Sequence, residues 1–328
     1  MKKIKILATG GTIAGKAASS TQLTGYTAGA YSVDDLLASV PTLGELAQIS
    51  GEQLCNIDSS SITDALLLRL AQRCNELLAQ EDVDGVVITH GTDTMEETAF
   101  FLNLTVKSDK PVVLVGAMRP ATAVSADGPL NIINAVKTAV CAESAGQGVL
   151  VVMNDEIYGG RDVMKTNTAN VATFKAPNGG ALGCIVGGEV RYYYRSVRPH
   201  TLAAEFAINN VTALPRVDII YAHIGQDRVL VDAACAAGAR GLVYAGSGMG
   251  SIHGAVEAAL AEAVQSGVVV VRSSRTGSGR VSAGLARWQE QGFLYADNLN
   301  PQKARLLLQL ALLQTHERSE VQELLLRY

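Results

Sequence analysis

The chain has 328 residues, of which 48% are hydrophobic and 18% are charged, and its formal net charge is −4. This composition is typical of a globular protein of about two domains and excludes a disordered or fibrous one. The acidic balance, with no run of four Lys or Arg, argues against a nucleic-acid-binding protein and against a polybasic membrane-binding one. We therefore expect a small-molecule substrate, no nucleic-acid partner and no membrane partner.

The five cysteines and five histidines have no metal-binding spacing, because the sequence contains neither C-x-x-C nor H-x-x-x-H. An odd number of widely spaced cysteines is typical of free thiols in a reducing compartment. The apolar stretch after Lys2 and Lys3 covers only residues 4–8, which is too short for the core of a signal peptide. We expect no metal, and a cytoplasmic protein that would be periplasmic only if a leader has been removed.

Short apolar runs alternate with helical patterns along most of the chain. Runs that are apolar on both faces predict buried strands of a parallel sheet. The predicted strands are 4–9, 85–90, 111–116, 148–154, 217–223, 241–248 and 267–274. Apolar residues recur every three or four positions within 59–80 and 252–264, and the segment 300–314 forms another helix with Pro301 in its first turn. The pattern predicts an α/β fold with helices on both faces of the sheet.

The alternation lapses between about residues 188 and 214, where tyrosines cluster and no steady period is present. It restarts at residue 217. We interpret this stretch as an interdomain connection. The expected organisation is an N-terminal domain over 1–190, a linker over 191–214 and a C-terminal domain over 215–328.

Two glycine-rich segments resemble nucleotide-binding motifs without completing them. Gly10, Gly15 and Lys16 have P-loop spacing, but Ala17 stands where a P-loop needs Ser or Thr to hold magnesium. The segment GSGMGS (246–251) has the G-x-G of a dinucleotide site but lacks its third glycine, and is more typical of a tight strand-to-helix turn. Neither segment favours a phosphate-binding protein.

Two Gly-Thr pairs follow predicted strands, at the sheet edge where α/β proteins place ligands. The first, in ILATGGTIAGKA (6–17), presents the hydroxyl of Thr12, which would need a neighbouring base to act as a nucleophile. The second, in GVVITHGTDTMEE (85–97), presents Thr92 and Asp93. Taken alone, Thr12 could simply satisfy backbone groups in a turn, and Asp93 could simply cap the N-terminus of a helix. Together they suit a small polar substrate with an ammonium group.

With these motifs the sequence resembles the bacterial-type L-asparaginases, in particular the type II asparaginase/glutaminase-asparaginase group. The resemblance covers nearly the whole chain. It is carried by ILATGGTIAG (6–15), GVVITHGTDTMEE (85–97), PVVLVGAMRP (111–120), SADGP (125–129), RPHT (198–201) and LNPQKAR (299–305).

The resemblance implies a hydrolase of linear amides that converts L-asparagine to L-aspartate and ammonia without a cofactor, and leaves L-glutamine open as a second substrate. It also implies a larger N-terminal domain with a mainly parallel sheet flanked by helices and a smaller C-terminal α/β domain. The family assembly is a homotetramer, a dimer of dimers with active sites at subunit interfaces.

The resemblance also assigns catalytic roles to individual residues. Thr12 is the nucleophile that forms an acyl-enzyme, and Tyr26 closes over the site and helps to activate it. Thr92, Asp93 and Lys165 form a second group, in which a lysine beside an aspartate has its proton affinity tuned to serve Thr92. Without the resemblance, Lys165 in MKTNTANVATFKA (164–176) would be taken for a solvated surface lysine.

Substrate contacts follow from the same resemblance. Ser59 binds the α-carboxylate of the substrate, and Asp93 holds its α-ammonium group. The carbonyl of Ala117 accepts a hydrogen bond from the leaving amide nitrogen, and Ser251 reaches in from the C-terminal domain of the neighbouring subunit.

Three departures from the family pattern affect these expectations. Ser60 stands where the family has a Gln or Glu that contacts the ammonium, and it is too short for the same contact. A partner-subunit carboxylate is also missing, since its region has Leu285, Ala286 and Arg287, with Glu290 the nearest acid. Each lost contact would weaken asparagine binding by about 1.5–3 kcal/mol. Finally, Ser108 replaces the cysteine that pairs with the position of Cys74 in some secreted relatives, which agrees with a cytoplasmic protein.

Two other functions stay open at this point. The lost ammonium contacts leave room for a ligand-binding protein that keeps the fold without efficient turnover, which steady ammonia release would exclude. An amidotransferase subunit that supplies ammonia to a tRNA-linked substrate is less favoured, because such proteins carry an additional N-terminal domain.

Overall fold

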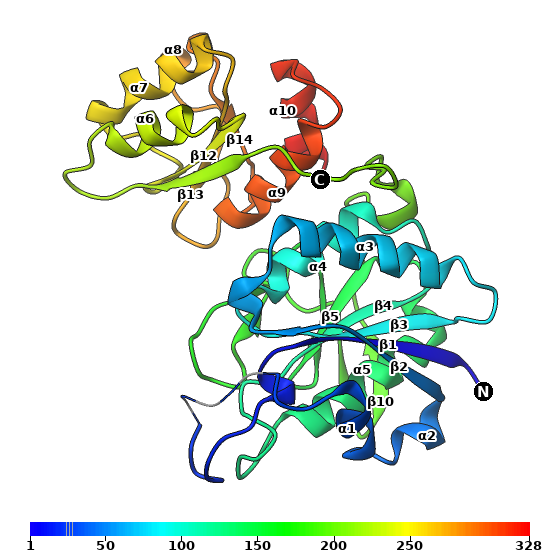
Figure 1. Ribbon diagram of the computed structural model, residues 1–328. Coiled ribbons are helices and arrows are strands. Elements are labelled where there is room, and N and C mark those ends of the chain that lie inside the picture. The colour runs from blue at the N-terminus through cyan, green and yellow to red at the C-terminus, as the bar shows by residue number, and fades with distance from the viewer. Residues whose placement is uncertain (24, 26, 28) are drawn as a thin grey trace. The chain divides into compact units, whose positions relative to one another are not determined.

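An eight-stranded sheet lies at the centre of the first of two units, Met1–Asn210, in the computed structural model (Figure 1). Its strands are β1 (Lys3–Gly10), β2 (Gln48–Ile57), β3 (Gly85–Thr89), β4 (Val112–Val115), β5 (Val149–Met153), β6 (Glu156–Gly159), β9 (Gly183–Val186) and β10 (Glu189–Tyr192). Their order is β10-β9-β6-β5-β4-β3-β1-β2. The five adjacent strands β2, β1, β3, β4 and β5 pair in parallel. Strands β6, β9 and β10 are antiparallel to their neighbours. The structure describes residues 1–23, 25, 27 and 29–328.

Helices cover both faces of this sheet (Figure 1). One face packs against α1 (Val33–Ala38), α2 (Leu43–Leu46) and α5 (Gly128–Val140), and the other against α3 (Asp64–Leu78) and α4 (Met95–Thr105). Because both faces are covered, every residue of β3, β4 and β5 is buried, as continuous apolar runs predict. Short 3₁₀ turns are formed by Thr12–Ala14, Ser59–Ser61, Ala142–Ser144 and Thr201–Ala203.

The second unit, Val211–Tyr328, has a smaller sheet of four parallel strands. The strands are β11 (Val217–Tyr221), β12 (Gly241–Gly246), β13 (Val269–Ser274) and β14 (Leu294–Tyr295), in that order across the sheet. Its helices are α6 (Val229–Ala236), α7 (Gly254–Gln265), α8 (Ala286–Glu290), α9 (Pro301–Ala311) and α10 (Arg318–Arg327). Proline begins α9, where its missing N–H costs no helical hydrogen bond.

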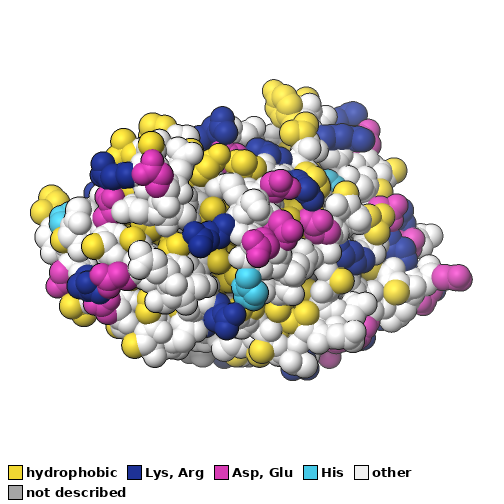
Figure 2. All heavy atoms as spheres, turned by 90° about the horizontal axis from the view of Figure 1, so that it is seen from above, with side chains coloured by type: hydrophobic (Ala, Val, Ile, Leu, Met, Phe, Trp, Pro, Cys, Tyr) yellow, Lys and Arg dark blue, Asp and Glu magenta, His cyan; other side chains and the backbone are white. Residues whose placement is uncertain are grey.

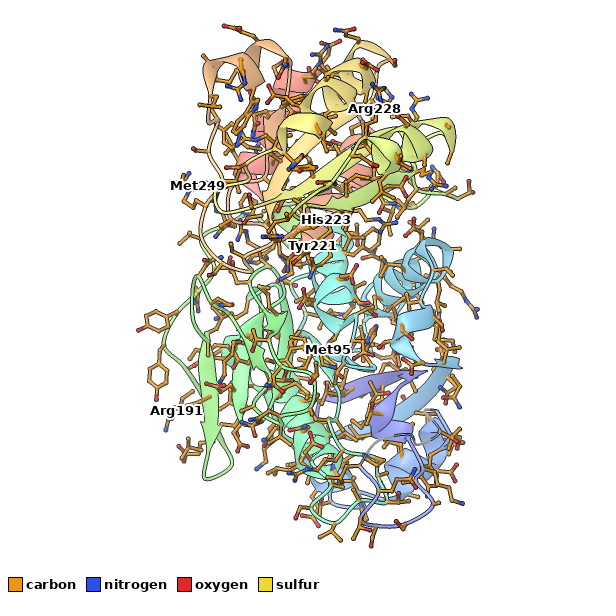
Figure 3. The ribbon with its side chains drawn as sticks, turned by 90° about the vertical axis from the view of Figure 1, so that its left-hand side faces the viewer. Met95, Arg191, Tyr221, His223, Arg228 and Met249 are labelled. Atoms are coloured by element: carbon orange, nitrogen blue, oxygen red, sulfur yellow. The ribbon has the colours of Figure 1, made fainter. Side chains whose placement is uncertain are left out.

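The α/β fold class, with a larger, mainly parallel sheet and a smaller parallel sheet, is confirmed. The structure adds an edge strand that the sequence did not predict, because residues 189–192 form β10 within the stretch expected to connect the domains. Arg191 of this strand projects at the outer edge of the first unit (Figure 3). The chain divides between Asn210 and Val211, and the boundaries 1–190, 191–214 and 215–328 stay a prediction.

The surface facing the viewer in Figure 2 mixes basic, acidic and hydrophobic side chains. Among the described residues on this face, neither sign of charge covers a continuous area. No helix of the described chain is both long and apolar enough to cross a membrane.

Candidate active site

Four neighbouring parallel strands, in the order β2-β1-β3-β4, end at the same edge of the large sheet. Each of them is followed within a few residues by a predicted site residue. These are Ser59 after β2, Thr12 after β1, Thr92 after β3 and Ala117 after β4. The carboxyl edge of a parallel sheet is the usual ligand site of α/β proteins. The topology therefore gathers segments that lie far apart in the sequence.

Glycines allow the three loops to approach each other closely. Gly11 has φ +80°, and a Cβ atom added to it would lie 2.4 Å from the Cα of Gly91. A Cβ on Gly91 would in turn lie 2.6 Å from the Oγ of Ser59. No side chain fits at either position without displacing its neighbour. The backbone of the Thr12 loop, the backbone of the Thr92 loop and Ser59 are thus in direct contact.

A cavity of about 440 Å³ opens at this junction. Five of the predicted residues line it, namely Thr12, Ser59, Thr92, Asp93 and Lys165. The described part of the wall also includes Gly11, Leu23, Gly25, Asp58, Gly91, Met118, Arg119, Thr168 and Ala169. The wall is therefore rich in hydroxyl and charged groups, as a small polar ligand requires.

Lys165 lines the cavity from β7 (Met164–Lys165), which pairs with β8 (Phe174–Lys175) outside the large sheet. Its Nζ donates to the Oγ1 of Thr92 at 2.9 Å and contacts the Oδ1 of Asp93 at 2.5 Å. The Lys165 side chain is 15% exposed and Thr92 is buried, whereas the Asp93 side chain is 59% exposed. The group is therefore open to the cavity on its carboxylate side.

Ser59 is held by the second Gly-Thr loop. Its Oγ accepts a hydrogen bond from the backbone N–H of Asp93 at 3.2 Å, and its carbonyl accepts one from the Oγ1 of Thr94 at 2.9 Å. Since the backbone N–H fills one acceptor position of the Ser59 hydroxyl, the hydroxyl proton is still available to a carboxylate in the cavity.

His90 lies beneath this loop and is fully buried. Its Nδ1 lies 2.6 Å from the carbonyl oxygen of Gly91, and its Nε2 lies 2.9 Å from the Oγ1 of Thr98. A carbonyl only accepts, so Nδ1 carries the hydrogen and Nε2 accepts from Thr98. Burial lowers the pKa of His90 to about 4, and the imidazole is neutral at physiological pH.

The remaining predicted residues have different surroundings. Ala117 is fully buried, and its neighbours Met118 and Arg119 line the cavity. Ser60 is exposed, is not among the described residues of the cavity wall, and donates through its Oγ to Asp58 at 3.1 Å. Tyr26 lies outside the described residues.

Ser251 belongs to the second unit, where it closes the turn after β12 by pairing with Ser247. Arg272 holds this turn through a hydrogen bond to the carbonyl of Gly250, and its guanidinium lies 4.3 Å from the ring centroid of Trp288. In the segment that lacks the family carboxylate, Arg287 forms an ion pair with Glu257 at 2.8 Å. The segment GSGMGS is thus a strand-to-helix turn.

Two charged residues of the cavity wall were not identified from the sequence. The Oδ1 of Asp58 accepts from the backbone N–H and the hydroxyl of Ser60, both at 3.1 Å. Arg119 donates to the carbonyl of Ser125 at 2.9 Å, and its backbone N–H is held by Asp127. An acidic residue directly before Ser59 is a signal that could have identified Asp58.

The described part of the glycine loop does not have the geometry of a P-loop. Lys16 pairs with Thr27 in a β-bridge, whereas the lysine of a P-loop lies at the start of a helix. Within the described residues, no cluster of His, Cys, Asp and Glu could hold a metal ion.

Two family models match almost the entire chain. "Asparaginase, N-terminal" matches residues 3–198, and "Glutaminase/Asparaginase C-terminal domain" matches residues 216–325. The chain belongs to the asparaginase family. This membership confirms the resemblance expected from the two Gly-Thr motifs.

Individual members of the asparaginase family are similar over nearly their full length. L-asparaginase 2 of Bacillus subtilis is 51% identical over 98% of this chain and 85% of that protein. The glutaminase-asparaginase of Acinetobacter glutaminasificans is 45% identical over 99% of both chains. A crystal structure described as a probable cytoplasmic L-asparaginase from Campylobacter jejuni matches with a TM-score of 0.98 and 50% identity, covering both chains completely.

Proposed function

We propose that the chain is an L-asparagine amidohydrolase that releases L-aspartate and ammonia through a threonyl acyl-enzyme, with L-glutaminase activity as a side reaction. The contact between the Lys165 ammonium and both Thr92 and Asp93, in one cavity with Thr12, is the observation that carries the proposal. The names of the relatives, L-asparaginase and glutaminase-asparaginase, support the same reaction.

In the first half of the reaction, the Oγ of Thr12 attacks the side-chain amide carbon of the substrate and loses its proton to a base. Tyr26 is the proposed partner that activates Thr12. The C–N bond then breaks, the nitrogen takes up a proton and leaves as ammonia, and the carbonyl of Ala117 accepts a hydrogen bond from it. An aspartyl ester of Thr12 is left behind.

In the second half, water attacks the ester carbon, and the bond to Thr12 breaks as its hydroxyl regains a proton. The group of Thr92, Lys165 and Asp93 moves protons to and from the reacting atoms. A threonine hydroxyl alone is a weak acid and a weak base. A lysine in hydrogen-bond contact with it provides the positioned proton donor or acceptor that general acid–base catalysis needs.

Opposite charges in the cavity suit an amino-acid substrate. Ser59 donates to the α-carboxylate, and Asp93 attracts the α-ammonium group. Asp58 adds a second carboxylate to the same wall and has no cationic partner among the described residues. It therefore replaces part of the attraction for the ammonium group that the family provides through a Gln or Glu at the position of Ser60 and through the carboxylate missing near Glu290.

We further propose a homotetramer, a dimer of dimers in which Ser251 of the partner subunit completes each site. A cytoplasmic location is supported by the five free thiols and by the description of the Campylobacter jejuni relative as cytoplasmic. A relative from Haemophilus influenzae is described as periplasmic, so fractionation of the native cells is the test of the location.

The direct test of the proposed function is ammonia release by the purified protein from L-asparagine and, separately, from L-glutamine. Steady release that saturates with asparagine, and a lower kcat/KM for glutamine, are the expected results. Binding of asparagine without steady release would favour the ligand-binding protein instead.

A further inference from the structure

Lys165 lies on a hairpin that is too short to fix its side chain by itself. The two strands, β7 and β8, contribute only two residues each, with Lys165 paired to Phe174. Isolated two-stranded ladders are marginally stable even when they are longer. The hairpin must therefore be anchored to the rest of the unit to keep the Lys165 ammonium in contact with Thr92.

The side of the hairpin that carries β8 is anchored to β6. The buried Tyr158 donates from its hydroxyl to the carbonyl of Phe174 at 2.7 Å. Lys175 forms an ion pair with Glu156 at 3.0 Å, although both of these side chains are well exposed. These contacts fix Phe174 and Lys175 on β8, the strand that pairs with β7. They do not hold β7 itself, which needs a contact on its other side.

That other side is held by Glu96, in the first turn of α4, one residue after Met95 in the interior of the first unit (Figure 3). The Oε2 of Glu96 accepts a hydrogen bond from the backbone N–H of Lys165 at 2.6 Å. Glu96 is only 4% exposed. A buried carboxylate that accepts an N–H bond makes a charge-assisted contact, which is stronger than a neutral one.

We propose that Glu96 is a positioning residue for Lys165, an inference that rests on the proposed amidohydrolase function. One continuous segment, the end of the Thr92 loop and the first turn of α4, then contacts Lys165 three times, through Thr92, Asp93 and Glu96. Glu96 fixes the backbone of Lys165, and the Oγ1 of Thr92 accepts a hydrogen bond from the Lys165 ammonium at the end of the side chain. A displacement of about 1 Å in such a constellation costs up to about 100-fold in rate.

Two conservative variants separate the position of the acceptor from its charge. Glu96→Gln keeps an acceptor oxygen at the same distance and removes the charge. Glu96→Asp keeps the charge and withdraws the acceptor by one methylene. We expect Glu96→Gln to keep kcat within about threefold of wild type and Glu96→Asp to lower kcat by about tenfold or more, with KM within about threefold in both. Glu97→Asp, one residue further along α4, is the matched control and should leave kcat unchanged.

Hydrogen exchange of the Lys165 amide provides a readout that does not depend on turnover. The amide should exchange about as slowly in Glu96→Gln as in the wild type and about tenfold faster in Glu96→Asp. An equal kcat for the two variants, a larger loss in Glu96→Gln than in Glu96→Asp, or equal exchange rates would each overturn the positioning role. Absence of ammonia release by the wild type would contradict the proposed function, and the exchange rates would still decide whether Glu96 holds Lys165.

Discussion

The Nζ of Lys165 lies 2.9 Å from the Oγ1 of Thr92, although 73 positions separate the two residues in the sequence. The pairing of strands in the large sheet does not by itself bring the two residues together. Thr92 follows the buried strand β3, whereas Lys165 comes from the β7–β8 hairpin outside that sheet. The contact joins a hydroxyl in the cavity wall to a cation that is itself paired with Asp93.

Replacement of this lysine should abolish most of the activity. We expect Lys165→Met to lower kcat at least about 100-fold, since general acid–base groups contribute about 10²–10⁴-fold. Lys137→Met is the control, because Lys137 lies in the last turn of α5 and belongs neither to the hairpin nor to the described cavity wall. Steady-state ammonia release measures both variants, and equal activities of the two would show that Lys165 has no catalytic role.

Asp58 should contribute to recognition of the substrate ammonium group. Asp58→Asn removes the charge and keeps the oxygen that accepts from the Ser60 N–H, so the local turn is retained. We expect KM for L-asparagine to rise about tenfold, which corresponds to about 1.4 kcal/mol. Succinamic acid, which is asparagine without its amino group, is the control substrate. A similar rise in KM for both substrates would indicate a structural effect instead.

Lengthening Ser60 should strengthen asparagine binding. The Ser60 hydroxyl donates to Asp58, and Ser60 is not among the described residues of the cavity wall. Ser60→Gln would provide an amide oxygen long enough to accept from the ammonium group, and we expect KM for L-asparagine to fall by about threefold to tenfold. Titration with asparagine in a Thr12→Ala background, which we expect to be inactive, measures the affinity directly. An unchanged or weaker affinity would show that the short side chain is not what limits binding.

His90 should make the folded protein sensitive to acid. Unfolded His90 takes up a proton near pH 6.5, whereas the folded residue does so only near pH 4. Between these values the unfolded state binds more protons, so the free energy of unfolding decreases as the pH falls. We expect the difference between wild type and His90→Gln to shift by about 3 kcal/mol in favour of the variant across this window. Urea unfolding at fixed protein concentration measures it, and a pH-independent difference would contradict the assigned neutral state.

The buried parallel strands could be predicted from the sequence because both of their faces are apolar. β2 could not, although it carries Ser59 at its end. It is the edge strand of the sheet, most of its residues are partly or fully exposed, and its sequence QISGEQLCNI has no apolar run. β10 was missed for the same physical reason at the opposite edge.

The candidate site was partly predictable for a related reason. Thr12 and Thr92 each come soon after a buried strand and directly after a glycine. The apolar strand followed by a Gly-Thr pair is the sequence signal that indicates both residues. Lys165 has no such signal, since its hairpin is short and polar, and only the family resemblance pointed to it. The place of Asp58 in the cavity wall depends on the direction in which the turn after β2 points its side chain. Because β2 itself was not predicted, the sequence could not show that direction.

The proposed reaction depends on a covalent intermediate at Thr12. Its most direct test is mass spectrometry of protein quenched in acid during turnover of L-asparagine, with Lys165→Met used to slow the later step. We predict one added aspartyl group on the peptide that contains Thr12, and none in Thr12→Ala. An aspartyl group on the peptide that contains Thr92 instead, or ammonia release by Thr12→Ala at the wild-type rate, would show that Thr12 is not the nucleophile.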